Sequence, residues 1–161
     1  MLNILELYAN ICKRLLNLYL GGRHEKSKIS NGKEIAFEAY QIEGSNYFKL
    51  RDLAMVVSGT EKQFQVGWDG AKNAINLTTK TAYTPDGKEL AVSQKPTAKE
   101  AKSTQSKIYL NGQEVQFTAY NIDGSNHFKL RDIAKAIDFT VTWDGKLNMI
   151  GIDTSTGYTV Q

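Results

Sequence analysis

One segment of this chain occurs twice, and this duplication constrains the fold more than any other feature of the sequence. Residues 39–52 read AYQIEGSNYFKLRD, and residues 119–132 read AYNIDGSNHFKLRD. A sequence that recurs in this way indicates that one structural unit is present in two copies. Each motif must therefore be interpreted in both copies before it is assigned a role.

The residues at the start of each copy predict β-hairpins. Asn-Gly pairs at 31–32 and 111–112 favour tight hairpin turns, because both central positions of a type I′ turn need positive φ. Apolar residues alternate along the segments that follow, which is typical of strands. Gly44 and Gly124 then stand in polar clusters that predict a second turn, so they are assigned a structural role.

A short helix is predicted after each of these glycine turns. Apolar residues share one helical face at 50–57 and again at 130–137. Alternating residues around an Asp-Gly pair then predict a further hairpin at 64–77 and at 139–152. We expect an α+β fold of two similar small units, each an antiparallel β-sheet curled around one short α-helix, preceded by an N-terminal amphipathic helix.

These patterns divide the chain into five segments. In order, they are an amphipathic helix at 1–22, a linker at 23–27, a first repeat at 28–84, a linker rich in Lys, Ser and Thr at 85–106, and a second repeat at 107–161.

The N-terminal segment combines an apolar stripe with a polar face. Lys13 and Arg14 interrupt the apolar run and no cleavage site follows, so a signal peptide is not predicted. Three interpretations stay open: the stripe docks on the folded units or associates with residues 1–20 of a second copy, it lies on a membrane surface, or it has no evolved role. No apolar run is long enough for a transmembrane segment.

Composition excludes several classes of protein. The chain has 20 basic and 17 acidic residues, a net charge of +3 without a dense basic run, which does not support nucleic-acid binding. Cys12 is the only cysteine, so neither an intrachain disulfide nor a cysteine-based zinc site can form.

Two motifs, each present in both copies at similar spacing, resemble a known family. They are FKLRDLA at 48–54 with VGWDG at 66–70, and FKLRDIA at 128–134 with VTWDG at 141–145. The chain resembles the copper amine oxidase N-terminal-like domain, also called the stalk domain, over residues 28–84 and 107–159. The resemblance implies an antiparallel sheet curled around a helix, found as a tandem repeat in extracellular or cell-surface proteins of Gram-positive bacteria, and a part of the oxidase that does not itself oxidise.

The residues needed for catalysis are not gathered in the sequence. Copper chemistry needs several converging histidines, and the chain has only His24 and His127. No run that could mature into a quinone cofactor and no calcium-loop spacing is found, so we expect no enzyme activity, no cofactor and no metal. The adjacent Arg and Asp of each copy are expected to tie loops together as structural residues: Arg51, Asp52, Arg131 and Asp132.

Repeated aromatic residues are the remaining candidates for a binding site. Trp68 and Trp143 could act as stacking platforms for sugars, helped by other rings at matching positions: Tyr40, Tyr120, Tyr47 and His127. Both tryptophans, however, share strand parity with neighbouring Phe and Val residues, which places them on the core face.

The preferred hypothesis is therefore a non-catalytic structural or interaction module, a spacer, adhesion or protein-binding unit of a bacterial surface or secreted protein. The alternative is a carbohydrate or cell-wall binding module that uses exposed aromatic residues. The expected partner is accordingly a protein or a cell-wall polymer, and not a nucleic acid.

Overall fold

A computed structural model describes residues 22–29, 32–95 and 97–160 of the chain. The protein has an α+β fold, built mostly from antiparallel strands, with two short helices among the described residues. The predicted N-terminal helix, its proposed self-association and Cys12 lie outside the described residues. No helix in the described part is long and apolar enough to cross a membrane.

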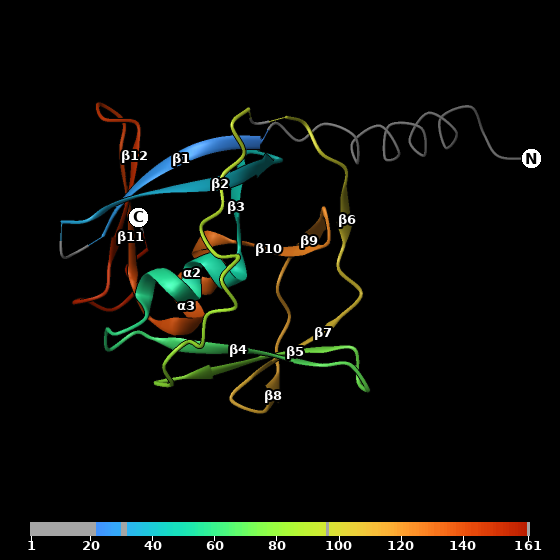
Figure 1. Cartoon of the computed structure of the whole chain (residues 1–161). Coiled ribbons are helices and arrows are strands. Elements are labelled where there is room, and N and C mark those ends of the chain that lie inside the picture. Colours follow the sequence, from blue (N-terminus) through green and yellow to red (C-terminus); the bar gives the residue numbers. More distant parts are fainter. Residues whose placement is uncertain (1–21, 30–31, 96, 161) are drawn as a thin grey trace, which may run out of the picture.

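The first repeat contributes five strands and one helix (Figure 1): β1 (Gly22–Ile29), β2 (Glu34–Ile42), β3 (Ser45–Lys49), α2 (Leu50–Val57), β4 (Phe64–Asp69) and β5 (Ala74–Thr79). The second repeat matches this order, with two short strands in the place of β2: β7 (Lys107–Leu110), β8 (Gln113–Glu114), β9 (Ala119–Ile122), β10 (Ser125–Lys129), α3 (Leu130–Ile137), β11 (Thr140–Asp144) and β12 (Met149–Asp153). One further strand, β6 (Ala101–Ser103), precedes it. The predicted linker at 23–27 is thus part of β1, and the predicted linker at 85–106 contains β6.

Two-residue turns build the matching hairpins of the repeats. In the β2–β3 turn, Glu43 and Gly44 have φ values of 49° and 79°, and in the β9–β10 turn Asp123 and Gly124 have 53° and 81°. Positive φ at both central positions is the condition for a turn whose twist matches that of the strands. The turns predicted at these two glycines are present in the fold.

The strands of the two repeats pair with one another. The equivalent strands β3 and β10 lie antiparallel, with the equivalent residues Phe48 and Phe128 directly opposite. The first strand of each repeat lies parallel to the last strand of the other, since β1 pairs with β12 and β7 pairs with β5. A pseudo-two-fold axis therefore passes between Phe48 and Phe128.

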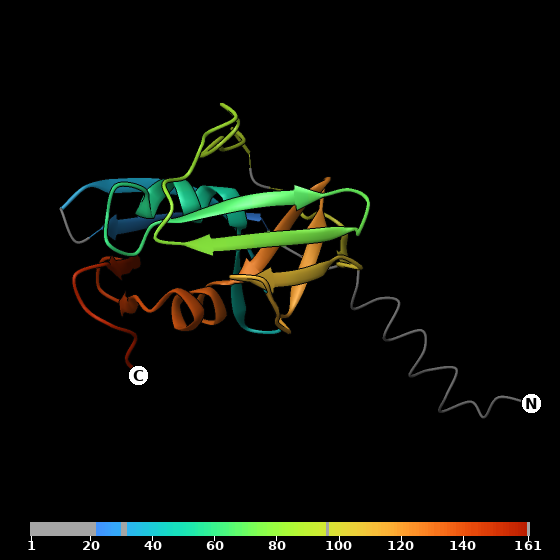
Figure 2. The same ribbon diagram turned by 90° about the horizontal axis from the view of Figure 1, so that it is seen from below.

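This exchange produces two sheets that both contain strands from each repeat. One has the order β11-β12-β1-β2-β3-β10-β9-β6, and the other has the order β4-β5-β7-β8. Figure 1 shows α2 and α3 between the β1–β2 strands and the β4–β5 strands, and Figure 2 shows β4, β5 and β7 side by side. The expectation of a separate sheet around each helix is not confirmed.

The interior is likewise shared. The faces predicted to be buried on α2 and α3 are buried, and they join one apolar cluster with strands of both repeats. The rings nearest the pseudo-two-fold axis pack edge to face, with centroids 5.3 Å apart for Phe37 and Phe48 and 6.2 Å apart for Phe117 and Phe128. Neither repeat closes a core without the other.

Candidate functional site

The two tryptophans lie at the surface, so the prediction that they face the core is wrong. Trp68 is 54% exposed and Trp143 is 51% exposed, although Val66 and Val141, two residues earlier on the same strand face, are buried. Alternation correctly gives the face of the strand, but both tryptophans stand at the hairpin end of their strand, beyond the last core residue. They are among the few exposed large apolar side chains of the described part.

Each indole lies in the same way against the turn that follows it. A Cβ atom built on Gly70 would lie 3.4 Å from Trp68 Nε1, and one built on Gly145 would lie 3.5 Å from Trp143 Nε1, which is ordinary contact distance. The same exposed platform is built twice.

Trp68 lines a pocket of about 290 Å³. The first repeat supplies most of its wall, from the start of α2 and from β4 and β5, together with Asp86 and Lys88 from the loop after β5. The remaining wall is the β9–β10 turn of the second repeat: Gly124, Ser125 and Asn126.

Trp143 lines the matching pocket, of about 330 Å³. Here the second repeat supplies the start of α3 and parts of β11 and β12, including Lys129 and Arg131. The first repeat supplies the β2–β3 turn: Gly44, Ser45 and Asn46. Because β3 pairs with β10, each turn is placed against the tryptophan strand of the other repeat, and both pockets need both repeats.

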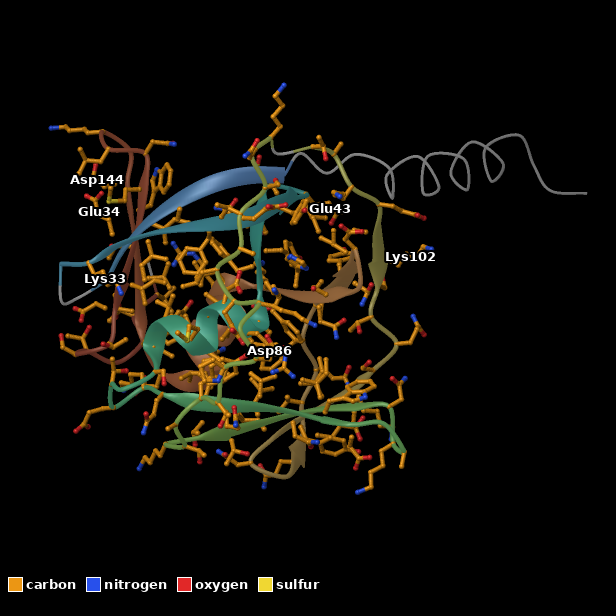
Figure 3. All side chains as sticks on the ribbon, in the orientation of Figure 1. Lys33, Glu34, Glu43, Asp86, Lys102 and Asp144 are labelled. Carbon is orange, nitrogen blue, oxygen red and sulfur yellow. The ribbon has the colours of Figure 1, made fainter. Side chains whose placement is uncertain are left out.

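The charged side chains of the Trp68 pocket are engaged by the loop after β5, which crosses in front of α2 in Figure 3, where Asp86 is labelled. Arg51 lies 3.3 Å from the Tyr83 hydroxyl, and Lys49 donates to the Lys88 carbonyl at 3.0 Å. Asp52, only 2% exposed, accepts the Leu90 N–H at 2.9 Å. Burial raises the pKa of the Asp52 carboxyl above its ordinary value.

The equivalent side chains of the Trp143 pocket are not engaged in this way. Lys129, Arg131 and Asp132 are half-buried, and their side chains form no hydrogen bond or ion pair with any residue that the structure describes. In the described part of the chain, no segment crosses α3 in the way that residues 83–90 cross α2. Among those residues, the cations of the two pockets therefore differ in their hydrogen bonds.

The other four aromatic candidates do not line the tryptophan pockets; three of them belong to a second apolar cluster, and His127 packs against it. Tyr40, Tyr47 and His127 are buried, and Tyr120 is half-buried. Edge-to-face pairs join Tyr40 with His127 and Tyr47 with Tyr120, both with centroids 5.2 Å apart. Each pair joins the two repeats, so these rings hold the halves together.

His127 also borders a small cavity of about 140 Å³ with Glu38, Lys49 and Asp52. Burial lowers the pKa of His127 to about 4, and Nδ1 lies 3.0 Å from the Ser125 carbonyl. At neutral pH, the His127 imidazole is therefore uncharged, and it packs as part of the interior. Among the described residues, no three His, Cys, Asp or Glu side chains are grouped to hold a metal ion.

Sequence reasoning missed the polar turn residues of the pockets. Ser45, Asn46, Ser125 and Asn126 were read as turn formers, whereas the structure also places them opposite a tryptophan of the other repeat. The same Ser-Asn pair occurs in both copies, and this repetition was the sequence signal that could have pointed to them.

Comparison with known protein families, with curated proteins and with solved structures finds no match to this chain. The resemblance to the copper amine oxidase N-terminal-like domain stays a prediction based on its motifs.

Proposed function

We propose that this chain is a non-catalytic interaction module of a bacterial surface or secreted protein, and that its two tryptophan pockets bind cell-wall carbohydrate. The observation that carries the proposal is the pair of half-exposed tryptophans, each set in an equivalent pocket. A concave pocket lined by an aromatic ring and a few polar groups is the usual form of a small-ligand site.

The composition of the pocket walls supports a sugar ligand. An indole offers a flat apolar face to the C–H groups of a pyranose ring, while a polar rim can hydrogen-bond its hydroxyls. Ser and Asn side chains supply that rim in both pockets.

Retention on insoluble peptidoglycan tests this function. We expect the chain to be retained, and Trp68→Ala with Trp143→Ala together to lower its affinity at least about tenfold, because each lost stacking contact is of the order of 1 kcal/mol or more. Thermal unfolding should change less than for a core substitution, since about half of each side chain is exposed.

Leu147→Ala is the matched control, because Leu147 is an exposed apolar residue outside both pockets. Equal retention of the double tryptophan variant and the Leu147 variant would contradict the proposal, as would no retention of the unchanged protein.

A second candidate function is that of a stiff spacer, and the strand exchange between the repeats favours it. Parallel pairing of β1 with β12 and of β5 with β7 ties each repeat to both ends of the other. Under an extending force, such a tandem protein should behave as one rigid unit, unlike two independent domains joined by a flexible linker. Force spectroscopy on the chain should then show one unfolding event, and two successive events would argue against this role.

A further inference from the structure

The small cavity beside His127 is a separate site from the two tryptophan pockets. Its volume is about 140 Å³, about half that of the Trp68 pocket, and neither tryptophan lines it. Its wall combines side chains from α2, from β2 and from the β9–β10 hairpin with Ala91 of the segment that follows. The two repeats therefore enclose this cavity together.

His127 places an acceptor atom in the wall of this cavity. Its Nδ1 lies 3.0 Å from the Ser125 carbonyl oxygen, which can only accept, so Nδ1 carries the proton and Nε2 of the neutral ring keeps its lone pair. His127 is 5% exposed, and no side chain or backbone group of the described residues donates to Nε2. A buried acceptor without a donor is costly, and native proteins rarely keep one. A ligand with an N–H group would satisfy it.

Asp52 places a second such acceptor in the same wall. Its Oδ1 accepts the Leu90 N–H at 2.9 Å and lies 3.8 Å from Lys49 Nζ, whereas Oδ2 receives no hydrogen bond within the described part of the chain. Burial raises the pKa of the Asp52 carboxyl, so the protein compensates its charge incompletely. A cation at Oδ2 would supply the missing compensation.

The charge of the cavity wall also favours a cation. Glu38, Asp52 and Asp123 line it, against the single ammonium of Lys49. Asp123 stands at the exposed rim, where Lys99 pairs with it at 3.0 Å. Even when this pair is counted as neutral, two carboxylates face one ammonium.

From these features we infer that the cavity binds a primary ammonium group, carried at the end of a lysine-type side chain on a partner peptide. An ammonium has three N–H donors, which match His127 Nε2, Asp52 Oδ2 and the Glu38 carboxylate. Buried Ile122 and the ring of Tyr40 offer apolar surface to the methylene groups, and the ring also attracts the charge. This site goes beyond the proposed binding of carbohydrate.

A metal ion fits this wall less well than an ammonium group does. In the described ranges, no three His, Cys, Asp or Glu side chains stand close enough together to hold a metal ion. An ammonium needs only acceptors at hydrogen-bonding distance from its own N–H groups, not a closed shell of ligands around one point.

Nitrogen NMR of the histidine rings tests the inference on the full chain, which has only two histidines, His24 and His127. At neutral pH, Nα-acetyl-lysine methylamide should shift the His127 Nε2 signal in a saturable way. The norleucine analogue, which lacks the amino group, should bind at least about tenfold more weakly, because hydrogen bonds to charged groups are the stronger kind.

Asp52→Asn keeps an acceptor for the Leu90 N–H but removes the charge, and should lower the affinity for the lysine derivative at least about tenfold. Asp132→Asn is the matched control, because this equivalent carboxyl does not line the cavity, and it should leave the affinity unchanged. His127→Phe removes Nε2 without touching Asp52, and should weaken binding as measured by the backbone amide signals of the cavity wall.

A cavity that holds only water would give no saturable shift with the lysine derivative, and this result would overturn the inference. Equal binding of the lysine and norleucine derivatives would do so too, as would equal losses in Asp52→Asn and Asp132→Asn or full affinity in His127→Phe. Retention on peptidoglycan tests the tryptophan pockets independently, because neither tryptophan lines this cavity.

Discussion

The Trp68 and Trp143 pockets are built from equivalent residues, yet among the described residues only the first is crossed by a further segment, residues 83–90. Residues 83–90 hold Arg51 and bury Asp52, whereas Arg131 and Asp132 stay partly exposed. The covering loop lies in the stretch that joins the repeats, where extra length costs little free energy. The same pocket frame is therefore observed in two surroundings, with residues 83–90 across it in the first repeat and without such a segment among the described residues of the second.

The largest effect on stability is expected from substitutions in the core that lies beneath both pockets. Phe48 and Phe128 are fully buried at the pseudo-two-fold axis. We expect Phe48→Ala and Phe128→Ala each to lower the free energy of unfolding by about 3–5 kcal/mol, because each leaves a cavity in the common core.

Urea unfolding measures this loss of unfolding free energy in each half when it is followed by the fluorescence of Trp68 alone, and then of Trp143 alone. Both reporters should give one shared midpoint in each variant, and Met55→Ala, at an exposed helix position, should shift it little. Separate midpoints for the two reporters would show that the halves unfold independently.

A smaller effect is expected from the equivalent residues Tyr47 and His127, because only the histidine should make the free energy of unfolding depend on pH. Burial lowers the pKa of His127 to about 4 from an ordinary 6.5, while the pKa of Tyr47 is raised to about 12, so Tyr47 stays neutral. As the pH falls, His127 is protonated in the unfolded chain near pH 6.5 but in the folded protein only near pH 4. The contribution of the neutral His127 to stability is therefore present above pH 6.5 and is lost as the pH falls to 4. At about 1.4 kcal/mol per pKa unit, the loss is about 3 kcal/mol.

His127→Tyr, which copies the first repeat, should remove this part of the pH dependence. Urea unfolding from pH 7 to pH 4 measures it in both proteins. An identical decline in the variant and the unchanged protein would refute the assignment to His127.

The smallest expected effect compares Asp52 with Asp132. Asp52→Ala should cost about 1–3 kcal/mol, because the Leu90 N–H loses its acceptor, whereas Asp132→Ala should cost about 0.5 kcal/mol or less. Because the pKa of Asp52 is raised, the part of the stability that is linked to its protonation is present below its ordinary pKa of 3.8 and is lost as the pH rises through the folded-state pKa, whereas the hydrogen bond to Leu90 does not depend on that proton. Thermal unfolding of both variants, with Asp52→Asn to remove the titration, measures the difference. Equal costs at the two positions would mean that the covering loop is unimportant.

Local features of the fold could be predicted from the sequence. The turns at Gly44 and Gly124 followed from residue chemistry, and the buried faces of the helices followed from the spacing of residues such as Leu53 and Ile133. These properties depend on neighbours within a few positions, which the sequence specifies directly.

The pairing of strands between repeats could not be predicted. The two copies are so similar that β7 shows the same alternation whether it pairs with β5 or with β12. The exposure of Trp68 and Trp143 was missed for a related reason, because alternation gives the face of a strand but not the point at which the core beneath it ends. The pockets could not be expected either, since each is completed by a turn from the other copy.

The central claim is that the two repeats exchange strands and so build both pockets together, and nuclear Overhauser effects between backbone protons test it most directly. The structure predicts contacts between Phe48 and Phe128, and between Ile75 of β5 and Ile108 of β7. If these contacts are missing, and the strands at 22–29 and 107–110 instead contact the last strand of their own repeat, the account is contradicted.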